Sequence, residues 1–315
     1  MDEWIKELPE DKRDEVWKKY NDAKDDDERI KIIHNYHPKG HINVEPIKYL
    51  DDFLRCIRLV STSSTWFRGE SKEHKLLIPK IYRGVDDTEP TDIFDESEVT
   101  KVLKKERKYF QEFRRRAKSI VNIEHDDIWS WYFLIQHYGG STRLLDWSNN
   151  PIIALFMALD TSRDSDKNPI VYLLASTVLT DYAFKDIGKD NAETGRVLYP
   201  GEDDTNKWIS NIVDNDFNIP DSPIALLPAN SDQRIVSQKS CFALFGKRLN
   251  GFVKDGKQIV CPCCDSRILF KIIIDGKSKN ALRQELKKIG ISSETVYPGL
   301  EGLTKELNEE FFTKK

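Results

Sequence analysis

The sequence predicts an α+β fold: a mixed β-sheet core, continuous or split, with flanking helices and an N-terminal helical extension. Two runs of mostly large apolar residues, 169–175 and 267–274, are apolar enough to be central strands. Helical patterns lie before, between and after these runs without regular alternation. Because a doubly wound fold requires strands and helices to alternate, the α+β arrangement is favoured.

The composition is that of a folded protein without a strong net charge. Of 315 residues, 39% are hydrophobic and 10% aromatic, which is enough apolar material for one large domain or two. The 49 basic and 53 acidic residues are spread along the chain and leave a formal net charge of −4. This balance gives no global field that would attract nucleic acid or an anionic membrane, so neither is an expected partner.

The sequence favours a reduced, cytoplasmic setting. No stretch approaches the roughly 20 apolar residues that span a bilayer, and the charged N-terminus is unlike a signal peptide. The cysteines are Cys56, Cys241, Cys261, Cys263 and Cys264. Their odd number and late clustering do not suit a disulfide framework.

Residues 1–45 are predicted to form the helical extension, and residues 46–315 the main domain. The run 10–34 has no Pro or Gly and carries apolar residues at helical spacing, which indicates one or two amphipathic helices. The acidic run Asp25-Asp26-Asp27 marks a helix start or the turn between two helices. We expect the extension to pack as a cap on the main domain.

The main domain is expected to begin with a strand over residues 63–69 and to continue with a long helix over 96–118. A mostly buried helix over 127–137 stops at Gly139-Gly140. Asn150-Pro151 begins the next helix, with Asn as N-cap and Pro at the first helical position. The prediction is completed by a strand over 241–245 and helices over 279–288 and 301–312.

A cysteine-rich segment follows the late strand. Residues 251–266 are interpreted as a surface insertion hairpin with Asp255-Gly256 as its turn. Its thiols Cys261, Cys263 and Cys264 lie close together, as in half of a zinc site, but a structural zinc site normally uses two ligand pairs with longer spacing. No metal site is therefore predicted, and zinc at these three cysteines stays an alternative.

Arg68 follows two aromatic residues at a predicted strand end, and Gly69 lets a ligand or another chain segment come close. A guanidinium there can bind phosphate or carboxylate through two hydrogen bonds, or pair with a buried acid such as Asp146. If a site at this place needs a carboxylate, Asp146 and Glu70 are the candidates.

A polar loop is predicted between the two buried helices, over residues 137–148. It is rich in hydrogen-bonding side chains and held by rigid flanking elements, as binding sites often are. A purely structural network, with Asp146 bonded to Arg143 and to loop amides, would explain the same residues. Gln238, before the late strand, is neutral, so it can orient a substrate but is a poor general base.

Four blocks of the sequence share polar residues at the ends of apolar elements. They are Trp66-Phe67-Arg68-Gly69-Glu70 with Leu77 to Arg83, Gln136 to Pro151, Gln238 and Phe242 in the stretch 234–242, and Gly290-Ile291 with Val296 to Leu300. Together they resemble the FRG-domain family, a mostly bacterial group named for its Phe-Arg-Gly motif, over roughly residues 48–305. The family usually has Pro where this chain has Ser141.

The order of these residues is also similar to that of ADP-ribosyltransferase-like domains, including the bacterial RES-type toxins that degrade NAD. The resemblance implies that Arg68 binds the NAD pyrophosphate and that Tyr138 or Trp147 stacks on the nicotinamide ring. Gln238 or Asp146 would stabilise an oxocarbenium-like transition state. The implied catalytic residues are Arg68, Asp146 and Gln238, and the implied cofactor contacts are Arg68, Gly69, His137, Tyr138, Thr142, Arg143, Trp147 and Ser148.

Gln238 departs from the transferase pattern, in which the last polar residue is usually Glu. The resemblance therefore leaves two functions open. One is an NAD-consuming enzyme, either a glycohydrolase or a transferase with a macromolecular acceptor, which would suit a bacterial toxin or phage-defence effector. The other is a module that binds a small nucleotide without chemistry.

Overall fold

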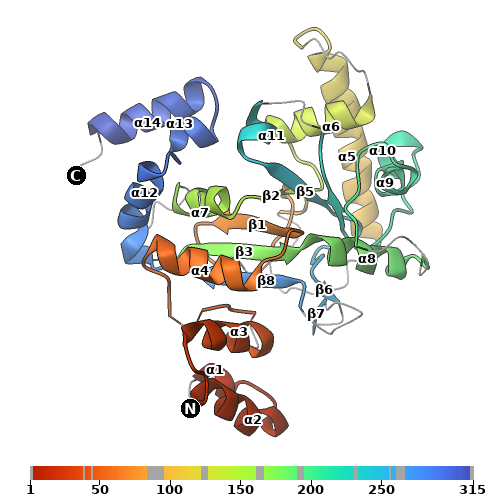
Figure 1. Ribbon diagram of the computed structural model, residues 1–315. Coiled ribbons are helices and arrows are strands. Elements are labelled where there is room, and N and C mark those ends of the chain that lie inside the picture. The colour runs from red at the N-terminus through yellow and green to blue at the C-terminus, as the bar shows by residue number, and fades with distance from the viewer. Residues whose placement is uncertain are drawn as a thin grey trace.

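The computed structural model describes residues 3–37, 40–43, 45–74, 76–83, 96–121, 127–160, 167–189, 195–229, 233–254, 257–259 and 267–312. Its centre is a six-stranded sheet flanked by helices, and three N-terminal helices project from one edge of the molecule (Figure 1). This arrangement confirms the α+β prediction. In the described part of the chain, no helix is long and apolar enough to cross a membrane.

The sheet consists of two three-stranded halves that are joined at one matched position. The strands are β1 (Thr65–Glu70), β2 (Leu144–Ser148), β3 (Ile170–Ala175), β4 (Ile224–Leu226), β5 (Ser240–Leu244) and β8 (Leu269–Ile273). Their order is β4-β5-β2-β1-β3-β8, and every pairing is antiparallel. β1 pairs with β3 along its whole length, whereas β1 and β2 are matched only where Phe67 lies opposite Ser148. We call the region where β1 and β2 diverge beyond this pair, residues 68–70 and 144–147, the seam.

Two elements differ from the sequence prediction. Residues 144–148, predicted as part of a polar loop, form the inner strand β2, which pairs with β5 along its length. The exposed Asp146 interrupts the apolar run and so conceals the strand in the sequence. The run 267–274, predicted as a central strand, contains the edge strand β8. Residues 41 and 47 form bridges to this run, and the cover that they provide accounts for its apolar composition.

Helices cover one face of the sheet in two groups. The first comprises α4 (Leu50–Val60), α7 (Pro151–Asp160) and α12 (Lys279–Lys288), which pack on Phe67 and Val171 of the β1-β3-β8 half. The second comprises α5 (Glu96–Ala117), α6 (Ile128–His137) and α9 (Asp203–Trp208), which pack on Leu144 and Phe242 of the other half. Asp146 faces the same side because it alternates with Leu144 and Ser148.

The remaining helices are short or lie at the margins. The 3₁₀ turn η1 (Lys80–Tyr82) follows β1, and α8 (Ser176–Asp186) follows β3 directly. The predicted helix ends agree closely with the structure, and Gly290 ends α12 in a left-handed conformation with φ of 84°. The others are α10 (Ser210–Val213), α11 (Gln233–Ser237), η2 (Gly276–Ser278), α13 (Ser293–Val296) and α14 (Leu300–Phe312).

The opposite face of the sheet is covered by shorter segments. Trp147 and Tyr172 pack there against Phe252, among other apolar residues. Phe252 precedes an antiparallel hairpin of β6 (Val253–Lys254) and β7 (Lys257–Gln258), whose predicted turn Asp255-Gly256 lies outside the described residues. Because Phe252 and Ile259 are buried, the base of this hairpin is part of the core.

The N-terminal extension consists of α1 (Glu3–Lys6), α2 (Glu10–Asn21) and α3 (Asp26–Tyr36), which confirms the helices predicted over 10–34. Asp25 is the N-cap of α3, and its Oδ1 accepts a hydrogen bond of 2.9 Å from the amide of Glu28. Trp4, Leu8 and Val16 belong to a small core of the extension's own.

A stack of rings joins the extension to the sheet. His37 lies between Trp4 and His41, with ring centroids 5.3 and 4.4 Å away, and His34 stacks on Phe270 of β8 at 4.3 Å. Burial, with a smaller contribution from His41, lowers the pKa of His37 from 6.5 to about 3. The stack is therefore built for neutral imidazoles.

Acidification should destabilise the protein through His37. Between pH 6.5 and about 3, the unfolded chain binds a proton at His37 that the folded chain does not, so stability is complete above pH 6.5 and falls as the pH is lowered. The slope from this residue is at most about 1.4 kcal/mol per pH unit. Urea unfolding at pH 5 to 8 measures it, and His37→Phe, which cannot titrate, should show a shallower decline. Equal declines in the two proteins would contradict the assignment.

Candidate functional site

Arg68 bridges the two halves of the sheet at the seam. Its Nε and Nη2 lie 2.8 and 2.6 Å from Oε1 of Glu70, and its Nη1 donates to the backbone carbonyl of Asp146 at 2.6 Å. Arg68 and Glu70 alternate along β1, so they leave the same face of the sheet, opposite to α7. The predicted pairing of Arg68 with a buried Asp146 carboxylate is therefore wrong: Asp146 is exposed and contributes only its backbone carbonyl, and the carboxylate partner is Glu70.

Asp146 presents an exposed carboxylate on the helix-covered face of the sheet, opposite to the face that Arg68 and Glu70 leave. Its Oδ1 accepts a hydrogen bond of 3.0 Å from Nε2 of Gln136, at the end of α6. The hydroxyl of Thr142 in turn donates to Oε1 of Gln136 and accepts from the amide of Leu144. These hydrogen bonds fix the orientation of the Asp146 carboxylate. Thr142, which is itself buried, holds the side chain of Gln136 in place.

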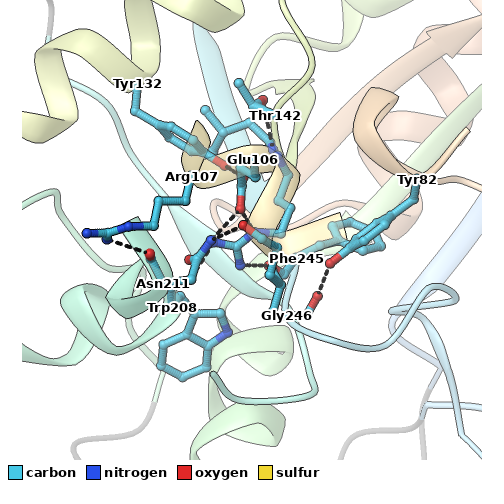
Figure 2. Close-up of polar contacts among 12 residues, drawn as sticks. Tyr82, Glu106, Arg107, Tyr132, Thr142, Trp208, Asn211, Phe245 and Gly246 are labelled. Atoms are coloured by element: carbon cyan, nitrogen blue, oxygen red, sulfur yellow. Dashed lines mark hydrogen bonds and ion pairs between the residues drawn. The ribbon is translucent and has the colours of Figure 1, made fainter. Parts of the chain in front are cut away.

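Arg143 lies in the interior and belongs to a buried polar network, whose members Glu106, Tyr132 and Asn211 are labelled in Figure 2. Its Nε donates to Oε2 of Glu106 at 2.8 Å, and its Nη atoms donate to the carbonyls of Phe245 and Trp208 and to Oδ1 of Asn211. Glu106 also accepts hydrogen bonds from the hydroxyl of Tyr132 and the amide of Asn211. The network joins α5, α6, β2, α9, α10 and the end of β5, which gives Arg143 a structural role.

The charges of this network are balanced within the core. Burial alone would lower the pKa of Arg143, but the neighbouring Glu106 carboxylate raises it above the ordinary value. Burial, reinforced by the charge of Glu106, also raises the pKa of Tyr132, so this phenol is protonated and donates to Glu106. Removal of one partner alone would leave the other as an uncompensated buried charge, which is strongly destabilising.

Hydrogen bonds connect the four motif blocks to one another. The amide of Ile81 in the first block donates to the carbonyl of Thr142 in the second, at 3.4 Å. Ser148 donates to the carbonyl of Gln238 at 2.7 Å, and Nε2 of Gln238 donates to the carbonyl of Val296 in the fourth block at 3.3 Å. Gln238 is only 7% exposed, so its amide serves this junction.

The other predicted contact residues fall in different environments. A Cβ on Gly69 would lie 1.9 Å from the carbonyl oxygen of Ala154, so the glycine is required by the close packing of α7 on β1. Trp147 is buried, and its indole N–H has no hydrogen-bond partner among the described residues. His137 and Tyr138 end α6, with Tyr138 69% exposed.

Sequence reasoning missed the residues beyond Glu70 on the same face. Oε2 of Glu70 lies 3.4 Å from Nε2 of His74, and the amide of His74 donates to the hydroxyl of Tyr172 at 3.3 Å. Tyr172 lies opposite Arg68 on one side and opposite Lys271 on the other. Only the strand register brings these residues together, so no local sequence pattern could reveal the group.

No cluster of three or more His, Cys, Asp or Glu side chains able to hold a metal ion occurs among the described residues. Cys56 and Cys241 are free and buried. The alternative of zinc at Cys261, Cys263 and Cys264 concerns residues outside the described ranges.

Removing one partner of the buried network should be costly. Glu106→Gln leaves Arg143 without a counter-charge in the core and is expected to lower the free energy of unfolding by about 3–5 kcal/mol. Glu112→Gln on the same helix is the matched control, because Glu112 pairs with Arg115 and Arg116 on the exposed surface. Urea unfolding compares the two, and a similar small loss in both variants would contradict the structural role of Arg143.

Comparison with known proteins gives one match. Residues 63–167, about a third of the chain, match the family model of the FRG domain. These residues include β1, α5, α6, β2 and α7, and therefore both Arg68 at the seam and the Arg143–Glu106 pair. No curated protein and no solved structure matches the chain. The chain thus contains an FRG domain, in which the Phe-Arg-Gly motif forms strand β1 and places its arginine at the seam.

Proposed function

We propose that this protein binds NAD at the seam and consumes it, by glycohydrolysis or by ADP-ribosyl transfer. The observation that carries the proposal is a partly exposed guanidinium, that of Arg68, held by the Glu70 carboxylate and the backbone carbonyl of Asp146 where the halves of the sheet diverge. This group of residues belongs to the matched FRG region.

Arg68 retains the capacity to hold a phosphate. A guanidinium has five N–H donors, and the contacts with Glu70 and the Asp146 carbonyl use three of its nitrogen atoms once each. One further N–H on each terminal nitrogen is left, in the forked geometry that suits two phosphate oxygens. With a side chain 15% exposed and already oriented, Arg68 loses little entropy on binding.

The charges around Arg68 favour NAD over a polyanion. The Glu70 carboxylate offsets the guanidinium, so this side of the seam has no excess of positive charge. A nucleoside triphosphate or a nucleic acid would be repelled by this carboxylate. NAD combines a pyrophosphate with a positively charged nicotinamide ring, so one end suits Arg68 and the other suits a carboxylate.

Asp146 is the carboxylate we assign to the reaction. When the bond between nicotinamide and ribose breaks, both electrons leave with the nicotinamide, which becomes neutral, and positive charge develops on the ribose. An exposed, oriented carboxylate stabilises that charge until water or an acceptor attacks. We assign Gln238 a positioning role, because its amide bonds Val296 and its carbonyl holds Ser148 at the end of β2.

NAD titration and NAD turnover test the proposal with wild type, Arg68→Ala and Asp146→Asn. Arg68→Ala should weaken NAD binding about tenfold to a hundredfold, because it removes charge-assisted hydrogen bonds. Asp146→Asn can still accept from Gln136, so it should bind NAD normally and turn it over about a hundredfold more slowly. Labelled NAD in cell lysate distinguishes transfer to a macromolecule from hydrolysis.

Arg115→Ala is the matched control, since Arg115 is exposed on α5 and pairs only with another surface residue. It should leave binding and turnover unchanged. Binding that depends on Arg68 without any turnover would support the alternative, a nucleotide-binding module, and refute the enzymatic half of the proposal. If NAD is not bound at all, the proposal fails.

Binding of NAD should depend only weakly on salt. Because Glu70 offsets Arg68, the affinity arises from directed hydrogen bonds more than from net charge, and such contacts are little screened. Titrations between 50 and 500 mM salt should change the dissociation constant less than about threefold. A loss of tenfold or more would show that an unbalanced basic surface elsewhere holds the ligand.

A further inference from the structure

A cavity of about 420 Å³ lies on the face of the sheet that carries Arg68 and Glu70. Its floor contains Tyr172 of β3 and Lys271 of β8, which lie directly opposite each other in the sheet. Phe252 before the hairpin, Leu77 after β1 and Leu269 of β8 provide apolar walls. Both the volume and the mixture of apolar walls with a few polar groups are typical of a small-molecule site.

The polar groups of the cavity can recognise the edge of a heterocycle. Tyr172 is 4% exposed, and because its hydroxyl accepts from the amide of His74, its own proton is left to be donated. Burial raises the pKa of Tyr172 to about 12, so this donor is present at neutral pH. The side-chain amide of Asn250 makes no hydrogen bond to another described residue and offers a donor and an acceptor side by side.

The cavity adjoins the seam. Tyr172 is the direct cross-strand neighbour of Arg68, and side chains at such positions lie within about 5.5 Å at Cβ. The carboxylate of Glu70 contacts Arg68 through one oxygen and lies 3.4 Å from the ring of His74 through the other. A ligand held by Arg68 can therefore extend over Glu70 into the cavity.

We infer that this cavity binds the adenine base of the nucleotide. Asn250 and Tyr172 form hydrogen bonds with the polar edge of the base, and Phe252 and Leu269 pack against its ring. Adenine carries an amino donor next to a ring-nitrogen acceptor, the pattern that an Asn carboxamide matches with two hydrogen bonds. The inference rests on the proposed function for the phosphate end of the ligand. The base pocket itself can be tested without phosphate.

Adenosine, which has no phosphate, is the direct probe, with purine riboside, which lacks the amino group, as the base control. Calorimetric titration of the full chain should show adenosine binding that weakens about fivefold to tenfold in Asn250→Ala and in Tyr172→Phe. Leu269→Trp, which fills the cavity, should abolish it. Leu303→Trp on α14, where Leu303 is 38% exposed, is the control for adding an indole, and thermal melting checks that each variant is folded.

Arg68→Ala separates this inference from the proposed function. It should leave adenosine binding unchanged while it weakens NAD. Adenosine binding that follows the cavity variants, with NAD neither bound nor consumed, would uphold the base pocket and refute the proposed function. The opposite result is NAD binding that is lost in Arg68→Ala but unchanged in Leu269→Trp and Asn250→Ala, with both of these variants folded. It would refute the base pocket and keep the proposed function. Equal affinity for purine riboside and adenosine would also overturn the assignment to adenine.

Discussion

One matched pair, Phe67 opposite Ser148, joins the two halves of the sheet, and the side chain of Arg68 completes the junction. Beyond this pair, β1 and β2 no longer share backbone hydrogen bonds, so the carbonyl of Asp146 needs another partner, and the guanidinium supplies it. The Phe-Arg-Gly motif follows from this geometry. Phe67 enters the core under α7, Arg68 spans the seam, and Gly69 gives α7 room to approach β1.

The seam depends on the rigid group behind it. Arg143 directly precedes β2. Its side chain is held by Glu106 of α5 and by backbone carbonyls at the ends of β5 and α9. On the other side, Ser148 and Gln238 attach the end of β2 to the segment before α14. With both ends of β2 held, the strand keeps its position although β1 meets it at one residue. A buried ion pair is costly to assemble, and its use here is consistent with a need to fix one arrangement of strands.

Much of the secondary structure could be predicted because its signals are local. Asp25, Asn150 and Gly290 cap helices where the sequence places them, and the long helix from Glu96 follows its apolar spacing. Strand β2 could not, because its identity depends on pairing with β5, more than ninety residues later in the chain. The candidate site could be predicted only in part, because some of its residues are brought together by strand pairing and not by local sequence. Motif residues pointed to Arg68 and Asp146, whereas Tyr172 and Lys271 are brought to the face of Arg68 only by strand register.

Hydrogen–deuterium exchange of the full chain with and without NAD tests most directly whether the seam is the ligand site. We expect NAD to slow exchange in residues 65–74 and 144–150, the two segments that contain the seam, and to leave α2 and α14 unaffected. The Arg68→Ala variant should lose this protection at the same NAD concentration. Protection confined to other elements, or no protection at NAD concentrations that saturate binding, would contradict the account.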